Sequence, residues 1–443
     1  MGDLSTPESI QKLQTALHGK AKEQPGYRFY ALYDKLYRTD ILRFAYACCK
    51  ANKGAAGVDG ERFEDIEAEG VDQWLGELAD VLRKKNYHAQ AVRRVYIPKT
   101  NGKLRPLSIP TIRDRTVMMA ATLVLSPIFE ADLPDEQYGY RPERGALTAV
   151  EEVRRLLKAG HRRVVDADFS DYFGEIPHAQ LLRSVARRVV DGRVLHLIKM
   201  WMTAPVEETD AWGNTHRTTP QKDAAKGISQ GSPISPLLSN LYMRRLVLGW
   251  KRLGFDRQFG AELVSYADDL VICCRRRADE ALTALRLLAG RLKLKVNDDK
   301  TRVRILPGGQ FDFLGYTFER CYSRRTGQAY LGARPSKKSL QRMVANISLA
   351  TARSTLLLDS TTVVERLNAQ LTGWANYFRL GTVSPAYQVV DRHAARQLRR
   401  WLCWKHKLRQ QRGNARFPDE YLRTGLGLVH LTSKPRSSPW ATP

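Results

Sequence analysis

The stretch "LVSYADDLVICC", from Leu263 to Cys274, places two adjacent carboxylates, Asp268 and Asp269, in the middle of an apolar run. A charged side chain that leaves water costs several kcal/mol unless a partner compensates it. The pattern predicts a strand, a tight turn and a second strand, with both carboxylates at the hairpin tip. A turn whose Asp side chains only satisfy nearby backbone groups would show the same pattern, so this stretch alone leaves both interpretations open.

A second acidic stretch, "VVDADFSDYF" (Val164–Phe173), makes a site the better interpretation. Residues two apart on a strand share a face, so Asp166 and Asp168 are expected on one face, with Asp171 beyond the strand end. If this strand lies beside the hairpin, Asp168 can meet Asp268. Converging carboxylates repel each other unless a cation lies between them, and Mg²⁺ prefers oxygen ligands. Two such ions about 3.5–4 Å apart are the arrangement used for phosphoryl transfer.

The charge balance points to a polyanionic partner. The chain has 443 residues, with 72 Lys and Arg against 46 Asp and Glu, a formal net charge of +26. Such an excess usually serves nucleic acid, although a merely soluble basic surface would give the same count. The hydrophobic fraction of 43% excludes general disorder. No apolar run approaches the roughly 20 residues of a membrane span, the N-terminus lacks a signal peptide, and no C-x-x-C pair suggests zinc, so we expect a cytoplasmic protein.

The patterns divide the chain into a mixed part and a helical part. Amphipathic helices are predicted before residue 90, and "RRVYIPKTNGKLRPLSIP" (Arg93–Pro110) predicts a β-hairpin with its turn at Asn101-Gly102. After residue 330 strand signals become scarce and three helices are predicted. A domain boundary is therefore expected near Leu331–Pro335.

Several ordered blocks resemble the reverse transcriptases encoded by bacterial group II introns, which also act as maturases. The blocks nearest the acidic pair are "YADD" itself, "DADFSDYF" upstream and "SQGSPISPLLSNLYM" between them. The others are "GVDG" (57–60), "IPKTNGKLRPLSIPTIRDR" (97–115), "YGYRPERGA" (138–146), "LKLKVNDDKT" (292–301), "FDFLGYTF" (311–318) and, for the maturase region, "LTGWANYF" (371–378). The resemblance covers most of the chain, in order and spacing.

The resemblance implies an α+β fold of the right-hand polymerase type, followed by an all-α domain. Fingers and palm would contain an antiparallel sheet backed by helices. The implied domains are 1–90, an N-terminal helical extension and the start of the fingers; 91–330, fingers and palm; 331–407, the thumb/maturase (X) domain; and 408–443, a short basic segment for DNA binding. No paired-cysteine frame for an endonuclease domain occurs in the chain, so that domain is expected to be absent.

The resemblance also assigns roles to residues. Asp168, Asp268 and Asp269 would hold two Mg²⁺ ions, assisted by the carbonyl of Phe169. A nucleotide pocket for deoxynucleoside triphosphates would be formed by Lys99, Arg105, Phe173, Gln230, Gly231 and Lys300. Phe173 would clash with a 2′-hydroxyl, although core packing is its alternative role. For the hairpin residues Lys99 and Arg105, the alternative is that they are simply solvated surface residues.

Two positions depart from the family pattern. Ser229 stands where the family often has proline, and Gly174 stands where it often has aspartate. Neither is an implied metal ligand, so we expect catalysis to survive, with effects on fidelity or nucleotide affinity.

The last predicted helix, from Ala394, interleaves cations with tryptophans. Cations contact phosphates and aromatic rings stack on unpaired bases, which predicts nucleic-acid binding by Arg396, Arg399, Arg400, Trp401, Trp404, Lys405 and Lys407. The alternative is a helix whose tryptophans face the core.

The predicted function is RNA-directed DNA synthesis, with binding of group II intron RNA to aid splicing and mobility. The partners would be intron RNA, an RNA template and a DNA primer or target, with no membrane; monomer and dimer on RNA stay open. Two alternatives remain at this point: an intron-derived polymerase recruited to repair or phage defence, and an RNA-binding splicing cofactor that needs no polymerase activity.

Overall fold

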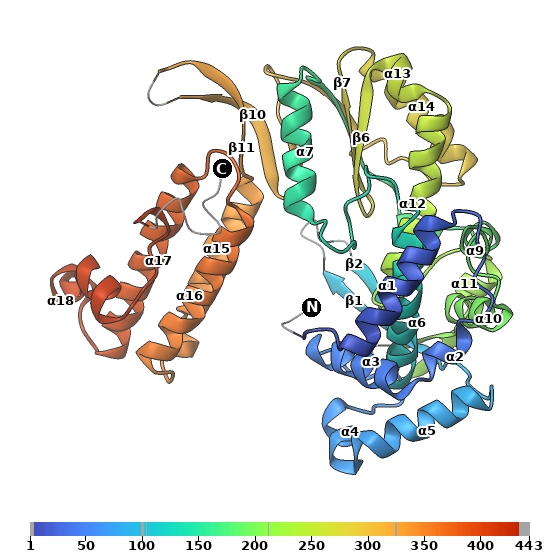
Figure 1. Ribbon diagram of the computed structural model, residues 1–443. Coiled ribbons are helices and arrows are strands. Elements are labelled where there is room, and N and C mark those ends of the chain that lie inside the picture. The colour runs from blue at the N-terminus through green and yellow to red at the C-terminus, as the bar shows by residue number, and fades with distance from the viewer. Residues whose placement is uncertain (1–3, 99–101, 103, 211, 324–325, 434–443) are drawn as a thin grey trace.

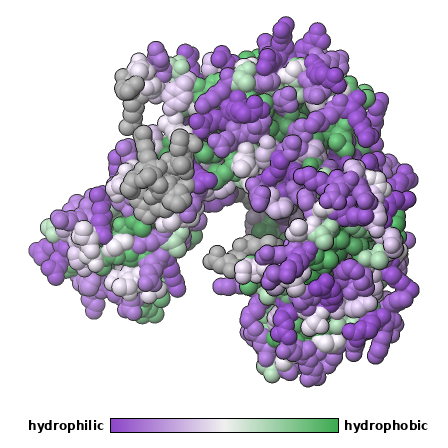
Figure 2. Space-filling model, viewed as in Figure 1, coloured by the Kyte–Doolittle hydropathy of each residue, from purple (hydrophilic) through white to green (hydrophobic). Residues whose placement is uncertain are grey.

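The computed structural model describes residues 4–98, 102, 104–210, 212–323 and 326–433. Figure 1 shows a large mixed body and a helical lobe, joined through the ribbon of β10 (Tyr316–Tyr322) and β11 (Ala329–Pro335). The space-filling view shows an open gap between lobe and body (Figure 2). None of the helices in the described part is both long and apolar enough to cross a membrane.

The central sheet of the body positions the acidic residues. Its order is β6 (Ala261–Tyr266), β7 (Asp269–Cys274), β3 (Arg163–Ala167) and β8 (Arg302–Ile305), with every neighbouring pair antiparallel. Adjacent residues of the inner strands are buried on opposite faces: Val164 and Val271 pack on the side of α7 (Ala146–Lys158), and Val165 and Ile272 pack on helices of the main core. The predicted antiparallel sheet backed by helices is confirmed.

Two smaller sheets flank the central one. The first has the order β2 (Leu104–Ile109), β1 (Val92–Pro98), β4 (Val206–Thr209) and β5 (Thr215–Thr218), and it contains the predicted β1–β2 hairpin. In the second, β10 pairs with β11 and with β9 (Phe311–Phe313).

The helices of the body surround these sheets. Those before β1 are α1 (Glu8–Glu23), α2 (Tyr33–Leu36), α3 (Thr39–Ala51), α4 (Phe63–Glu69) and α5 (Val71–Arg83). The helix after β2, α6 (Ile112–Glu130), is buried on nearly all sides, as its apolar sequence predicts. The others are α8 (Tyr172–Glu175), α9 (His178–Ala186), α10 (Gly192–Met202), α11 (Pro220–Asp223), α12 (Ser235–Arg252), α13 (Phe255–Phe259) and α14 (Ala278–Arg291).

The lobe is all-helical and has its own core. It consists of α15 (Lys337–Ala350), α16 (Ser360–Tyr377), α17 (Ser384–Lys405) and α18 (Gly413–Arg416), with short turns η1 (Arg353–Thr355), η2 (Gln410–Arg412), η3 (Tyr421–Gly425) and η4 (Leu431–Ser433). The first helix of the lobe begins at Lys337, just after the predicted boundary at Leu331–Pro335, which is occupied by the end of β11. Residues 408–433, expected as a separate segment, share the core of the lobe through Phe417, Leu422, Leu428 and Leu431.

The loop before α12 is docked on the β1–β2 hairpin. Ser108 of β2 donates its N–H to the carbonyl of Gln230 at 2.7 Å. The next residue, Gly231, has a φ of +107°, and a Cβ there would lie 2.6 Å from the carbonyl oxygen of Ser108. Glycine is required at this position both by its backbone conformation and by the contact.

We expect Gly231→Ala to destabilise the body more than Gly160→Ala does. Gly160 has a similar φ of +95°, but a Cβ there would meet nothing within 4 Å. The control should lose only the backbone-strain part, about 1 kcal/mol, whereas Gly231→Ala should lose about 2–3 kcal/mol because the clash is added. Urea unfolding of both variants measures the difference; equal losses would contradict the docking argument.

Candidate active site

The acidic turn is the two-residue loop of the β6–β7 hairpin. Tyr266 pairs with Asp269, which leaves Ala267 and Asp268 as the loop. Ala267 has a φ of +56°, as the first loop residue of a type II′ turn requires. A non-glycine residue pays for this conformation, so the turn is held by its surroundings. The predicted strand, tight turn and strand are confirmed.

The central sheet brings Asp168 to this turn. The antiparallel register pairs Ala167 with Leu270. Asp168, which follows Ala167, therefore lies opposite Asp269, which precedes Leu270. The carboxylates repel one another. Loss of hydration, and next the charges of Asp268 and Asp168, raise the pKa of Asp269 to about 6. Loss of hydration, and also Asp168, raise the pKa of Asp268. The three predicted carboxylates therefore converge.

The block "NDDKT" holds Asp168 in place. Lys300 donates from Nζ to Oδ2 of Asp168 at 2.9 Å, and Asn297 donates from Nδ2 to the same oxygen at 3.2 Å. The backbone is fixed as well, because Asn297 donates its N–H to the Asp168 carbonyl at 2.8 Å and Asp168 donates its N–H to Thr301 Oγ1 at 3.2 Å. The sequence analysis predicted that Lys300 contacts the nucleotide, but it missed Asn297 and Thr301. The only sequence feature that could have indicated these two residues is their position in the same block as Lys300.

The donor set at the turn fits a hard divalent cation. Carboxylate oxygens are the ligands that Mg²⁺ prefers. Phe169 and Val296 face each other in an antiparallel bridge whose hydrogen bonds are made by the residues on either side of them. Because successive carbonyls of an extended chain point in opposite directions, the Phe169 carbonyl points away from that bridge. Among the described residues, no group of three or more Asp, Glu, His or Cys side chains is arranged to hold a metal ion as it stands. Here the ammonium of Lys300 compensates Asp168.

Asp166 lies on β3 behind the turn. Burial, and next the charge of Asp269, raise the pKa of Asp166 to about 6, while Arg304 opposes that shift. Its side chain lines a polar cavity that also includes Arg304, Asp312, Glu319 and Arg320.

The departure at Gly174 has a structural reason. Asp171, at the start of α8, has a φ of +47°, and its carboxylate lies over Gly174, where a Cβ would be 2.1 Å from Oδ2. An aspartate at position 174 would meet that carboxylate. At the other departure, the buried Ser229 accepts a hydrogen bond at its carbonyl from Ser235 Oγ at 2.7 Å.

The predicted nucleotide-side residues have different surroundings. Arg105, exposed on β2, lowers the pKa of Asp268, so it lies within electrostatic reach of the turn. Phe173 is half-buried, whereas its neighbour Tyr172 is fully buried and donates to the Ser239 carbonyl. The close backbone approach of Gly231 is made to Ser108 of β2. Lys99 lies outside the described residues.

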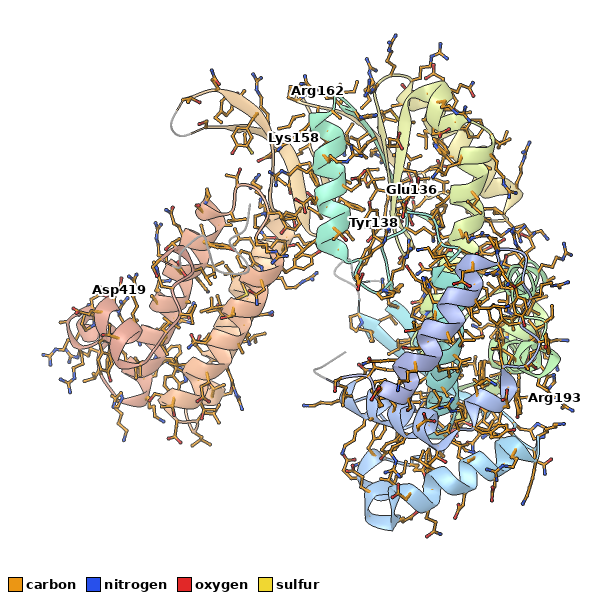
Figure 3. The ribbon with its side chains drawn as sticks, in the orientation of Figure 1. Glu136, Tyr138, Lys158, Arg162, Arg193 and Asp419 are labelled. Atoms are coloured by element: carbon orange, nitrogen blue, oxygen red, sulfur yellow. The ribbon has the colours of Figure 1, made fainter. Side chains whose placement is uncertain are left out.

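One predicted nucleic-acid contact in α17, Trp401, is wrong, and two others, Arg399 and Lys405, have partners within the lobe. Trp401 is 0% exposed and donates from Nε1 to Thr355 Oγ1 at 3.0 Å, so no base can stack on it. Arg399 is held by the Phe417 carbonyl and by Asp419, which Figure 3 labels on the outer lobe. Lys405 donates to the carbonyls of Leu356 and Leu358 at 3.2 and 2.7 Å. Trp401 thus faces the core, as the alternative interpretation had it, while Arg399 and Lys405 bond to other groups of the lobe.

The remaining predicted contacts in α17 reach solvent. Arg396, Arg400 and Lys407 are exposed, and Trp404 is half-buried. The Trp404 ring lies against two guanidinium groups, with the Cζ atoms of Arg353 and Arg400 each 4.8 Å from its centroid. This stack offers cations and an aromatic edge together on the lobe surface.

Comparisons with known proteins agree on two families. Residues 97–318 match the family model for reverse transcriptase (RNA-dependent DNA polymerase), and residues 340–417 match the model for the group II intron maturase-specific domain. The chain is 32% identical to Protein YkfC of Escherichia coli over 368 residues, which are 74% of this chain and 93% of that protein. It is 33% identical over 235 residues to the group II intron-encoded protein LtrA of Lactococcus lactis, covering 52% of this chain and 37% of LtrA.

We expect Trp401 and Trp404, three residues apart on α17, to behave in opposite ways. Trp401→Ala should destabilise the lobe by about 3–5 kcal/mol, because it empties a fully buried site. Trp404→Ala should leave the melting temperature of the lobe within a few degrees and weaken binding of single-stranded RNA several-fold. Thermal unfolding and fluorescence anisotropy measure the two effects. A loss of RNA affinity in Trp401→Ala without loss of stability would overturn the assignment of Trp401 to the core.

Proposed function

The chain belongs to the reverse transcriptases that carry a group II intron maturase-specific domain, and we propose that Asp168, Asp268 and Asp269 carry its RNA-directed DNA synthesis. The observation that supports this most is the convergence of three carboxylates from two chain segments about 100 residues apart. A turn that only satisfied its own backbone would not need Asp168 beside it. The substrates would be deoxynucleoside triphosphates, a DNA primer and an RNA template.

Each residue has a role that its chemistry allows. The three carboxylates, with the carbonyl of Phe169, would hold two Mg²⁺ ions, which when bound would lower the pKa of the primer hydroxyl and stabilise the pyrophosphate. Lys300 and Arg105 supply positive charge beside the carboxylates, where a triphosphate would lie. Because the ammonium of Lys300 is bonded to Asp168, its transfer from carboxylate to phosphate would accompany substrate binding.

The remaining pocket residues would select and seat the nucleotide. Phe173 would exclude a 2′-hydroxyl with the exposed part of its ring. Gln230 and Gly231 would form a wall of the pocket, held rigid by their docking on β2. Lys99, on the same hairpin by sequence, would add a phosphate contact.

The helical lobe would bind intron RNA. It carries the maturase-specific match, and the exposed Arg396, Arg400, Trp404 and Lys407 offer charge and a ring to phosphates and unpaired bases. The net charge of +26 suits a large RNA. We place this activity, splicing and mobility of the intron, in the bacterial cytoplasm.

We expect Asp268→Ala to abolish primer extension on an RNA template with Mg²⁺, with loss of at least about 1000-fold in rate, since a removed ligand cannot be replaced by water alone. RNA affinity should change less than 2-fold, because the lobe cations lie elsewhere. Asp269→Asn serves as the near-isosteric partner and should also lose extension. In buffer with chelator its melting temperature should not fall, because a charge that the neighbouring carboxylates repel is removed. A parallel fall of RNA affinity and activity would show that the turn is structural.

We expect Phe173→Ala to admit ribonucleotides. The preference for dGTP over rGTP in kcat/KM should fall by about 10-fold or more, since the ring no longer meets the 2′-hydroxyl. Tyr172→Phe is the control, because it keeps the packing and removes only the hydroxyl that bonds to Ser239. Unchanged sugar discrimination in Phe173→Ala would remove the proposed role of this ring.

A further inference from the structure

A short segment, Glu136–Arg141, runs beside β6 and ends at the acidic turn. Ser265 donates its N–H to the Glu136 carbonyl, and Tyr138 donates its N–H to the Ser265 carbonyl, both at 2.8 Å. These bonds form a parallel bridge at Gln137. Figure 3 labels Glu136 and Tyr138 of this segment, with Tyr138 nearer to α7 than Glu136 is.

The segment is anchored on the side of α12 as well. Gln137, only 1% exposed, donates from Nε2 to the Asn240 carbonyl at 3.0 Å. Asn240, also buried, donates from Nδ2 to the carbonyl of Gly139 at 2.7 Å. Two side-chain amides thus fix the backbone immediately before residue 140.

The backbone on either side of residue 140 is fixed by close contacts. A Cβ at Gly139 would lie 2.5 Å from the backbone nitrogen of Ala267, so the segment touches the strained turn itself. Arg141 is 8% exposed, and its guanidinium bonds to Glu130 and to the carbonyls of Pro134 and Gln137, each at 2.7 Å. An arginine with this many partners cannot move without breaking a buried network.

Between these anchors lies Tyr140, whose side chain the core does not use. It is 56% exposed and has a φ of +57°, a conformation that a bulky residue adopts only under constraint. Its ring centroid lies 6.3 Å from that of Tyr266, the residue that closes the acidic turn. Loss of hydration, and next the charge of Asp268, raise the pKa of the Tyr140 hydroxyl, and Arg105 opposes this. The ring thus lies beside the turn, within electrostatic reach of Asp268 and of Arg105 on the hairpin.

We propose that Tyr140 packs its ring against a nucleobase of the primer–template beside the acidic turn and so positions the strand for synthesis. This inference rests on the proposed function of the turn. An exposed flat ring held rigidly next to a phosphoryl-transfer site matches the chemistry of a base, since every base presents a π-face. Packing within the protein does not explain the ring, because more than half of its surface is free.

The test compares three variants at position 140 with the intact chain. Tyr140→Phe keeps the ring, Tyr140→Ala removes it at the same backbone strain, and Tyr140→Gly removes the ring and relieves the positive φ. Tyr30→Ala is the control, since Tyr30 is 70% exposed on the N-terminal segment. The primer–templates carry 2-aminopurine either at the templating base or at the primer 3′ end, and its fluorescence reports stacking.

We expect Tyr140→Ala and Tyr140→Gly to weaken primer–template binding by about 10-fold and to restore fluorescence at one of the two labelled positions. That position identifies the strand that Tyr140 contacts. Tyr140→Phe and Tyr30→Ala should behave as the intact chain. The melting temperature of Tyr140→Gly should equal or exceed that of the intact chain, which a structural role for the ring would not allow.

Two results would overturn the inference. In one, Tyr140→Ala binds and quenches as the intact chain does while the intact chain extends primers normally. In the other, Tyr140→Phe loses as much as Tyr140→Ala, which would assign the effect to the hydroxyl. Absence of extension by the intact chain would instead contradict the proposed function, while the fluorescence, which needs only binding, would still report on the ring.

Discussion

Mutual repulsion of three carboxylates is the constraint on which the centre of this structure depends. Asp168 disfavours the ionised form of Asp268, Asp168 and Asp268 together disfavour that of Asp269, and only a rigid scaffold can keep the three together. Antiparallel pairing of β3 with β7 supplies that rigidity, since its register cannot slip by one residue without turning every buried side chain to the other face. The bonds from Asn297 and Lys300 to Asp168 then offset part of the repulsion while leaving the other two carboxylates open to a cation.

Backbone strain gathers around this centre. Ala267 in the turn, Tyr140 beside it and Asp171 after β3 all have positive φ without being glycine. Each such residue costs of order 1–3 kcal/mol and persists only where neighbours determine its conformation. At Ala267 that neighbour is Gly139, whose missing Cβ lets one backbone rest on another. The strained residue and the glycine that contacts it therefore depend on each other. Buried hydrogen bonds outside the turn hold it in a conformation that its own sequence does not favour.

The sequence predicted the elements better than the surroundings of individual side chains. The hairpin around Asp268 and the helical lobe follow from alternation and periodicity, which are local, whereas the antiparallel sheet was implied by the family resemblance. Which face of α17 is buried is not local, because it depends on α16 and on residues 408–433 that pack on it. Trp401 and Trp404 are equal by composition and spacing, yet one fills the core and the other lies between two guanidinium groups. Asn297 was missed for the same reason, since its partner Asp168 lies 129 residues away.

The lobe shows that charge counting does not identify a nucleic-acid surface. Arg399 and Lys405 were assigned to RNA by charge, but each is committed to backbone carbonyls of its own lobe. A cation bonded in this way contributes to the long-range field and still steers a polyanion toward the lobe. A phosphate contact that replaced these part-buried hydrogen bonds would return little, because a surface ion pair is weak. Specific contact would then fall to cations such as Arg400 that stack on an aromatic ring, because stacking leaves the N–H edge of the guanidinium able to donate to a phosphate.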